Sequence, residues 1–308
     1  MIKHCYKPKI SIIMPFRNCA KTLRKSISSC LNQSLKDIEL IVLNDCSDDD
    51  GACIVKELAS LDSRLVFINN TERLGIFASR NLGLLSARSE LVMFVDADDI
   101  LCEKACEICF NVALEFSDVD LFCFEAFVQR SKKKLFYKIK QDKIYERDEF
   151  LNFLSRQKHF YHSVWAKLFR KKNVLKALSC VNMNENLNYA EDLLFYYLNL
   201  ICANKIFCSK EVIYTYCFNE NGVFNSNDES ILNENIKHKA KVLDIFKKNS
   251  KKDRTAFSKL LLFIQMQDLK DLKFRLKKIQ KRLSFLDKFL LKLRRKRRKR
   301  ILRTYKKN

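Results

Sequence analysis

The hydrophobic and polar positions of the first hundred residues alternate between two periods. Short apolar runs rich in branched residues are typical of buried strands, and the segments between these runs carry apolar residues at helical spacing. The predicted strands are 9–14, 38–43, 65–68 and 91–95, and the predicted helices are 20–31, 54–61 and 74–85. Alternation of strands and helices with short links predicts an α/β fold, in which helices cover both faces of a mostly parallel sheet.

Clustered carboxylates follow two of the predicted strands. Asp96, Asp98 and Asp99 come directly after the fourth strand, and an Asp-rich segment that begins at Asp45 follows the second strand. Parallel strands end at one edge of a sheet, so we expect the two groups to converge on one crevice. Carboxylates this close repel one another unless a cation lies between them, which favours a divalent metal shared with a substrate phosphate. The alternative is a solvated turn or helix start, and we favour that alternative for Asp99 alone.

Short motifs spread over most of residues 9–220 resemble, in order and spacing, the inverting family-2 glycosyltransferases of the GT-A fold. The motifs are Ser11–Pro15, Val42–Ser47, Asn69–Gly75, Ala78–Gly83, Asp96–Asp99 and Glu191–Asp192. A narrower likeness, to bacterial lipooligosaccharide β-1,3-galactosyltransferases, rests on Ala105–Cys109, Leu121–Phe127, Trp165–Lys167 and Ala190–Tyr197. The resemblance implies a Rossmann-like GT-A domain with a helical C-terminal extension. It also implies inverting transfer of a hexose, with galactose as the best choice, from a UDP-sugar.

The resemblance assigns four residues to the donor site. Pro15 and Asp45 correspond to nucleotide-sugar-binding positions, with Asp45 at the uracil. Asp96 corresponds to the ribose and metal region, and Asp98 corresponds to the ligand of Mn²⁺ or Mg²⁺. A metal there would neutralise the charge that grows on the leaving diphosphate.

Two further positions of the donor site have to be weighed. Arg80 corresponds to a uracil or phosphate contact, although an isolated arginine on a helix is more often a surface residue. Cys46 replaces the glycine that the family usually carries after the second strand, which affects the expected geometry of that turn.

Inverting transfer also needs a base that removes the proton of the acceptor hydroxyl, and the resemblance implies Asp192 for this role. Glu191 would orient or bind the acceptor. Spacing alone favours a simpler interpretation, in which the two carboxylates open the predicted helix 187–200 and complement its N-terminal dipole. Trp165, the only tryptophan, can offer its ring to an acceptor sugar, and a buried core position is an equal alternative.

Three cysteines have the spacing of a radical-SAM iron–sulfur site, namely Cys102, Cys106 and Cys109. Such a loop should be accompanied by a Gly-rich cofactor segment, but the whole chain has four glycines. The three residues also follow helical periodicity, so we interpret them as small buried helix residues.

Positive charge concentrates at the C-terminal end of the chain. Residues 281–308 hold fourteen Lys or Arg and one Asp, out of a net charge of +23, and Arg294–Arg300 is an unbroken basic run. Apolar residues among the preceding lysines give a basic amphipathic pattern, which favours an anionic membrane surface as partner. The alternatives are a solvated tail, or a nucleic-acid- or membrane-binding protein on an inactive GT-A scaffold. No helix-turn-helix, zinc or RNA-binding signature is present, so we expect no nucleic-acid partner.

The domain organisation follows from these assignments. We predict a GT-A domain at 1–218, whose nucleotide-sugar half is 1–125 and whose acceptor half is 126–218. A helical region at 219–290 and a basic tail at 291–308 follow.

Thirteen scattered cysteines indicate reduced thiols, and neither a signal peptide nor a run of 18 apolar residues is present. We therefore expect a cytoplasmic enzyme that is peripheral on the inner face of the cytoplasmic membrane. Its expected acceptor is a lipid-linked oligosaccharide of lipooligosaccharide synthesis.

Overall fold

The computed structural model describes residues 7–129, 133–135, 139–157, 162–218, 228–250 and 255–280. The chain divides into two compact units. The first unit comprises residues 1–146, 162–187 and 195–218, and the second comprises residues 147–161, 188–194 and 219–308. The predicted basic tail and the amphipathic pattern before it lie outside the described residues.

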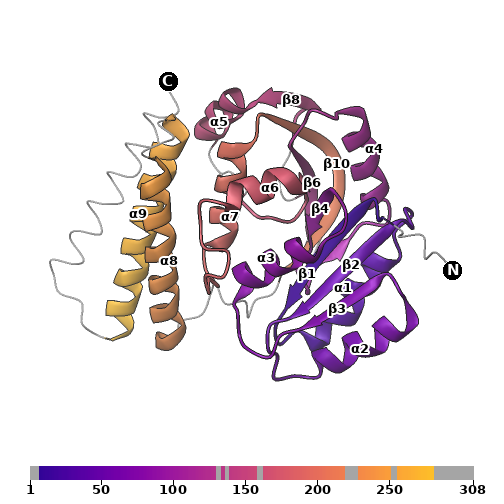
Figure 1. Cartoon of the computed structure of the whole chain (residues 1–308). Helices are drawn as coiled ribbons and strands as arrows, with labels where there is room; N and C mark the ends of the chain where they lie inside the picture. The colour runs from indigo at the N-terminus through magenta and orange to yellow at the C-terminus, as the bar shows by residue number, and fades with distance from the viewer. Residues whose placement is uncertain are drawn as a thin grey trace. The chain divides into compact units, whose positions relative to one another are not determined.

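One mixed sheet forms the centre of the first unit, with the strand order β3-β2-β1-β4-β9-β6-β10-β5. The strands of this sheet that Figure 1 labels are β1, β2, β3, β4, β6, β8 and β10. The strands on this path are β1 (Ile10–Phe16), β2 (Ile38–Asn44), β3 (Leu65–Asn69), β4 (Leu91–Phe94), β5 (Ile100–Leu101), β6 (Leu121–Gln129), β9 (Lys167–Arg170) and β10 (Lys205–Cys217). Strands β3, β2, β1 and β4 are parallel, which confirms the predicted α/β architecture. Strand β9 runs antiparallel to both β4 and β6 and joins this half of the sheet to the parallel pair β6 and β10. Two short strands, β7 (Lys133–Leu135) and β8 (Lys143–Glu146), pair antiparallel with β6 and β10.

Helices cover both faces of the parallel half because β1 is apolar on both sides. Ile12 and Met14 belong to the core cluster that also contains Leu23 of α1. Ile13, between these two residues, points to the opposite face of the sheet and faces α3. This helix lies so close that a Cβ added to its Gly83 would be 2.5 Å from Cγ2 of Ile13. The described helices of this unit are α1 (Ala20–Leu31), α2 (Gly51–Leu61), α3 (Ile76–Ser86), α4 (Ala105–Glu115) and α6 (Lys171–Leu178), and most of α7 (Glu191–Cys202) also belongs to it.

The three cysteines with iron–sulfur spacing lie at helix α4. Cys106 and Cys109 are buried within the helix, and Cys102 is half-buried just before it. Burial raises the pKa of the Cys106 and Cys109 thiols. The N–H of Cys106 donates a hydrogen bond to Oε1 of Gln33, which ties the start of the helix to the end of α1. For Cys106 and Cys109 the structure supports the interpretation as buried helix residues.

The second unit is helical where the structure describes it. Its helices are α5 (Arg147–Arg156), α8 (Glu229–Ser250) and α9 (Ala256–Ile279), and it includes the first turn of α7. Helices α8 and α9 pack along each other, and α5 also contacts α9. The helical C-terminal extension is thus confirmed. Within the described ranges, none of the helices has the length and apolarity needed to cross a bilayer.

Candidate active site

Asp45 directly follows β2 and holds the turn that leads into α3. Its side chain is buried, and its carboxylate accepts hydrogen bonds from the N–H groups of Leu74 at 2.7 Å and Gly75 at 3.1 Å. Gly75 has a φ of 86°, a conformation that residues with a side chain rarely adopt. A carboxylate beside a helix N-terminus is stabilised by the helix dipole. The carboxylate predicted to contact uracil therefore has a fixed position beside the entry to α3.

Cys46 adopts a left-handed backbone conformation, with a φ of 56°. Neighbouring side chains hold this turn, because Oδ1 of Asn44 accepts from the N–H of Ser47 at 2.9 Å and Nδ2 of Asn44 donates to Asn69 at 2.8 Å. The left-handed conformation costs a residue with a Cβ about 1–2 kcal/mol. The replacement of glycine by cysteine therefore keeps the turn but lowers its stability.

The loop after β4 carries the second group of carboxylates, and Asp99 anchors it. Asp99 is 0% exposed and accepts hydrogen bonds from the Tyr214 hydroxyl and the Cys217 N–H, both at 2.7 Å. Burial and the carboxylates of Asp96 and Asp98 raise the pKa of Asp99 to about 9. Asp99 does lie in a turn, in which its N–H donates to the carbonyl of Asp96 at 3.1 Å, but the prediction that it is solvated was wrong. The physical reason is that β10 supplies two hydrogen-bond donors to it, which a pattern of neighbouring residues cannot reveal.

Three hydroxyl groups that the sequence analysis missed hold the same loop. The Tyr214 hydroxyl also accepts a hydrogen bond from the N–H of Asp96 at 3.1 Å. On α1, the hydroxyls of Thr22 and Ser26 donate to the carbonyl of Ala97 at 3.0 and 2.9 Å. The spacing of Thr22 and Ser26, four residues apart on one helix face, was the only local signal for this contact.

Asp98 is half-buried, and this burial raises its pKa, so its ionised form lacks full hydration. Within the described residues, no group of three or more His, Cys, Asp or Glu side chains is arranged to hold a metal ion. The loop after β4 offers a divalent cation the two neighbouring carboxylates of Asp96 and Asp98. Mg²⁺ and similar hard cations are often bound by one or two carboxylates together with water and substrate phosphate oxygens, and this donor set fits that pattern.

Arg80 lies on α3 and is 2% exposed, so it is not the surface residue that the sequence allowed as an alternative. Its Nη2 lies 2.9 Å from Oδ1 of Asp96, which is about a quarter exposed. The guanidinium thus places a fixed positive charge beside the carboxylate loop.

The other two predicted site residues in the first unit, Pro15 and Trp165, are buried. Pro15 lies within β1 and is in register with Leu43 of the neighbouring strand β2. Leu43 precedes Asp45 by two residues. Trp165 is 6% exposed, and its ring is nearly parallel to that of Tyr214 with centroids 5.0 Å apart. The tryptophan therefore packs against the tyrosine that anchors the carboxylate loop, and its acceptor role stays a prediction.

Glu191 and Asp192 form the first turn of α7 and belong to the second unit. Glu191 is buried, and Asp192 is half-buried. The residue before them, Ala190, has a left-handed φ of 64°, and its carbonyl accepts the N–H of Leu194 at 3.2 Å. Both carboxylates therefore lie where the chain turns sharply into a helix, at the end that favours negative charge.

Comparisons with known proteins agree with this fold. A family model described as "Glycosyl transferase family 2" matches residues 11–178. The chain is 28% identical over 221 residues to the cholesterol galactosyltransferase of Borreliella burgdorferi, which covers 68% of this chain and 60% of the relative. It is 40% identical over 99 residues to the GalNAc(5)-diNAcBac-PP-undecaprenol β-1,3-glucosyltransferase of Campylobacter jejuni, which covers 32% of each chain. The chain thus spans less than two thirds of the length of these curated relatives.

Among solved structures, that of S. aureus TarS 1–349 in complex with UDP-GlcNAc has a TM-score of 0.61 to this chain. The match has 18% sequence identity and covers 97% of this chain and 90% of the TarS chain. At this identity the likeness concerns the fold, and it confirms the GT-A architecture. The family model covers more than half of the 308 residues, so the chain belongs to glycosyl transferase family 2.

Proposed function

We propose that this chain is an inverting glycosyltransferase that moves a hexose from a UDP-sugar to a lipid-linked oligosaccharide. The observation that carries the proposal is the position of the carboxylates. Asp45 follows β2 and Asp96 and Asp98 follow β4, and these two strands flank β1 in the parallel half of the sheet. In sheets of this kind, ligands bind beyond the carboxyl ends of the strands.

The donor half of the site has groups suited to a nucleoside diphosphate. Asp45 binds uracil, Pro15 lines the same site, and Asp96 lies in the ribose region with Arg80 as its buried partner. Asp98 would hold a divalent Mn²⁺ or Mg²⁺, which would supply Lewis-acid stabilisation of the negative charge on the departing diphosphate. The UDP-GlcNAc bound by TarS, which has the same fold, supports a UDP-sugar as donor.

The acceptor half supplies the base. Asp192 removes the proton of the acceptor hydroxyl, whose oxygen attacks the anomeric carbon while UDP leaves from the opposite side. The configuration at that carbon is therefore inverted. Glu191 and Trp165 orient the acceptor. General-base catalysis of this kind is typically worth about 10²–10⁴-fold in rate.

The sugar and the acceptor are proposed from the relatives. Galactose as the transferred hexose is supported by the name of the Borreliella relative, a galactosyltransferase. A lipid-linked acceptor is supported by the name of the Campylobacter relative, which acts on an undecaprenol-linked glycan. The proposed role in lipooligosaccharide synthesis rests on the sequence resemblance alone.

The basic run Arg294–Arg300 would keep the enzyme at the inner face of the cytoplasmic membrane, where a lipid-linked acceptor is presented. Each basic residue near an anionic surface contributes about 1 kcal/mol to binding. Co-sedimentation of the full chain with anionic vesicles tests this part, and equal co-sedimentation after deletion of residues 294–308 would contradict it.

The experiment that tests the proposed function is UDP release across a panel of UDP-sugars, with Mn²⁺ present and truncated lipooligosaccharide as acceptor. We expect one UDP-hexose to be consumed faster when acceptor is added. Absence of acceptor-dependent UDP release with every donor would contradict the proposal.

A further inference from the structure

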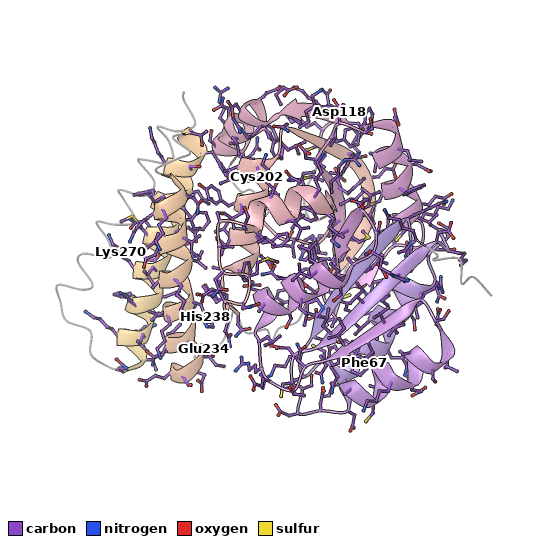
Figure 2. The ribbon with its side chains drawn as sticks, viewed as in Figure 1. Phe67, Asp118, Cys202, Glu234, His238 and Lys270 are labelled. Carbon is purple, nitrogen blue, oxygen red and sulfur yellow. The ribbon has the colours of Figure 1, made fainter. Side chains whose placement is uncertain are left out.

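Helix α8 contacts the segment that leads to the proposed base. The N–H of Asn188 donates to Nδ1 of His238 over 3.3 Å. His238 is 7% exposed, and its Nε2 faces Oε1 of Glu234 at 3.9 Å, one turn earlier on the same helix (Figure 2). Nδ1 of His238 is therefore the hydrogen-bond acceptor for this segment.

The next residue of α8 makes a second contact to the same segment. Lys239 is buried, and its Nζ lies 5.8 Å from the ring centroid of Tyr189, within the range of a cation–π interaction. The same Nζ lies 3.8 Å from Oδ2 of Asp268 on α9. Burial lowers the pKa of Lys239, and the Asp268 carboxylate opposes this shift. Removal of the ammonium would therefore loosen Tyr189 and leave Asp268 without this ion pair.

The two contacts hold in place the two residues that precede a strained turn. Ala190 has a φ of 64°, which costs about 1–2 kcal/mol for a residue with a Cβ. Such a conformation persists only where the surrounding structure enforces it. On the N-terminal side, His238 and Lys239 fix Asn188 and Tyr189. On the C-terminal side, the first hydrogen bond of α7 fixes the carbonyl of Ala190.

We propose that His238 and Lys239 are positioning residues for the base. They hold Asn188 and Tyr189 so that the chain enters α7 through the left-handed turn at Ala190, and this turn sets the direction of Asp192. The inference rests on the proposed role of Asp192 in catalysis. It gives a function to helix α8, which lies beyond the residues 11–178 that the family model matches.

The test compares four single variants of the full chain. His238→Leu removes the hydrogen-bond acceptor, whereas His238→Asn keeps an acceptor, because its Oδ1 takes the place of Nδ1. Lys239→Met keeps most of the length of the side chain and removes the ammonium. Lys237→Met is the matched control, because Lys237 is exposed on the same helix. The measurements are kcat and KM for the UDP-sugar, and hydrogen exchange of the Asn188 amide.

We expect His238→Leu to lower kcat by about 10²-fold, because small misplacements of a catalytic group have effects of this size. The KM for the UDP-sugar should stay unchanged, and exchange at Asn188 should become faster. His238→Asn should restore both kcat and slow exchange, Lys239→Met should lower kcat by about tenfold, and Lys237→Met should behave as wild type.

Three results would overturn the proposal. These are wild-type kcat in a folded His238→Leu variant, equal loss in His238→Asn and His238→Leu, or unchanged exchange at Asn188 in His238→Leu. If His238→Leu does not fold, the other two variants still test the proposal. A lowered kcat in His238→Asn contradicts the proposed role of His238, and wild-type kcat in Lys239→Met excludes a positioning role for Lys239. The Asp192→Asn variant distinguishes failure of the proposed function from failure of the positioning proposal. Wild-type kcat in Asp192→Asn refutes the role of Asp192 as base. Hydrogen exchange at Asn188 is measured without any activity and therefore tests the His238 contact by itself.

Discussion

Nη2 of Arg80 lies 2.9 Å from Oδ1 of Asp96, and this ion pair joins helix α3 to the carboxylate loop after β4. The start of the same helix is held by Asp45, which accepts the N–H groups of Leu74 and Gly75. Helix α3 therefore connects both groups of carboxylates in the first unit. A shift of this helix would move the proposed uracil contact and the proposed ribose contact together.

Arg80→Met should destabilise the protein by about 2–3 kcal/mol, because it leaves Asp96 beside other carboxylates without its charged partner. The loss should be smaller than for a fully buried pair, since Asp96 is partly exposed. The matched control is Arg24→Met, which removes an Arg–carboxylate pair with Glu57 on the surface and should leave stability unchanged within error. Urea unfolding measures both variants, and equal stability of the two would show that the Arg80 pair is unimportant.

Cys46→Gly should stabilise the protein by up to about 1 kcal/mol. Glycine removes the cost of the left-handed conformation at φ 56°, and part of this gain is offset by the greater freedom of glycine in the unfolded chain. Cys53→Gly, at an exposed position inside α2, should lower stability instead because glycine disfavours helix. Thermal unfolding of the two variants checks the opposite signs. A lower melting temperature for Cys46→Gly would mean that the thiol packing outweighs the backbone strain.

The sequence predicted the parallel half of the first unit well because local patterns determine it. The runs at β1 and β2 are mostly apolar and rich in branched residues, interrupted by Ser11 and Glu39, and such short runs are typical of buried strands. Contacts made between distant segments were not predictable in this way. Asp99 bonds to Tyr214 and Cys217, more than a hundred residues away, and no local pattern distinguishes it from an Asp at a helix start. Arg80 likewise has nothing in its own segment that reveals its burial or its pairing with Asp96.

The stability of the protein should fall as pH rises, through the contribution of Asp99. Burial and the neighbouring carboxylates raise its pKa in the folded state to about 9, against an ordinary value of 3.8. Between these two values the folded state binds a proton that the unfolded state has released, so higher pH favours unfolding. Asp99→Asn, which does not titrate, should show a flatter profile. Melting temperatures from pH 5 to 9 in EDTA measure the difference, and parallel profiles would refute a protonated Asp99.

Asp192→Asn should lower kcat by about 10²–10⁴-fold, because the amide keeps the shape of the side chain but cannot accept the acceptor proton. Affinity for UDP should hardly change. Asp148→Asn is the control, since Asp148 is an exposed aspartate in the first turn of α5 and tests the loss of a helix-end charge alone. Isothermal titration with UDP and steady-state kinetics separate the two effects. Weaker UDP binding at an unchanged kcat in Asp192→Asn would assign the residue to the donor instead.

The most direct test of the central claim is acceptor-dependent UDP release by the wild type and by Asp98→Ala, each with Mn²⁺ and with EDTA. The account predicts activity for the wild type only with metal. It predicts that Asp98→Ala, with Mn²⁺ or with EDTA, has an activity several orders of magnitude below that of the wild type with Mn²⁺. The melting temperature of that variant in EDTA should be close to that of the wild type. Undiminished wild-type activity in EDTA, or wild-type activity in a folded Asp98→Ala variant, would contradict metal-assisted transfer at the carboxylate loop.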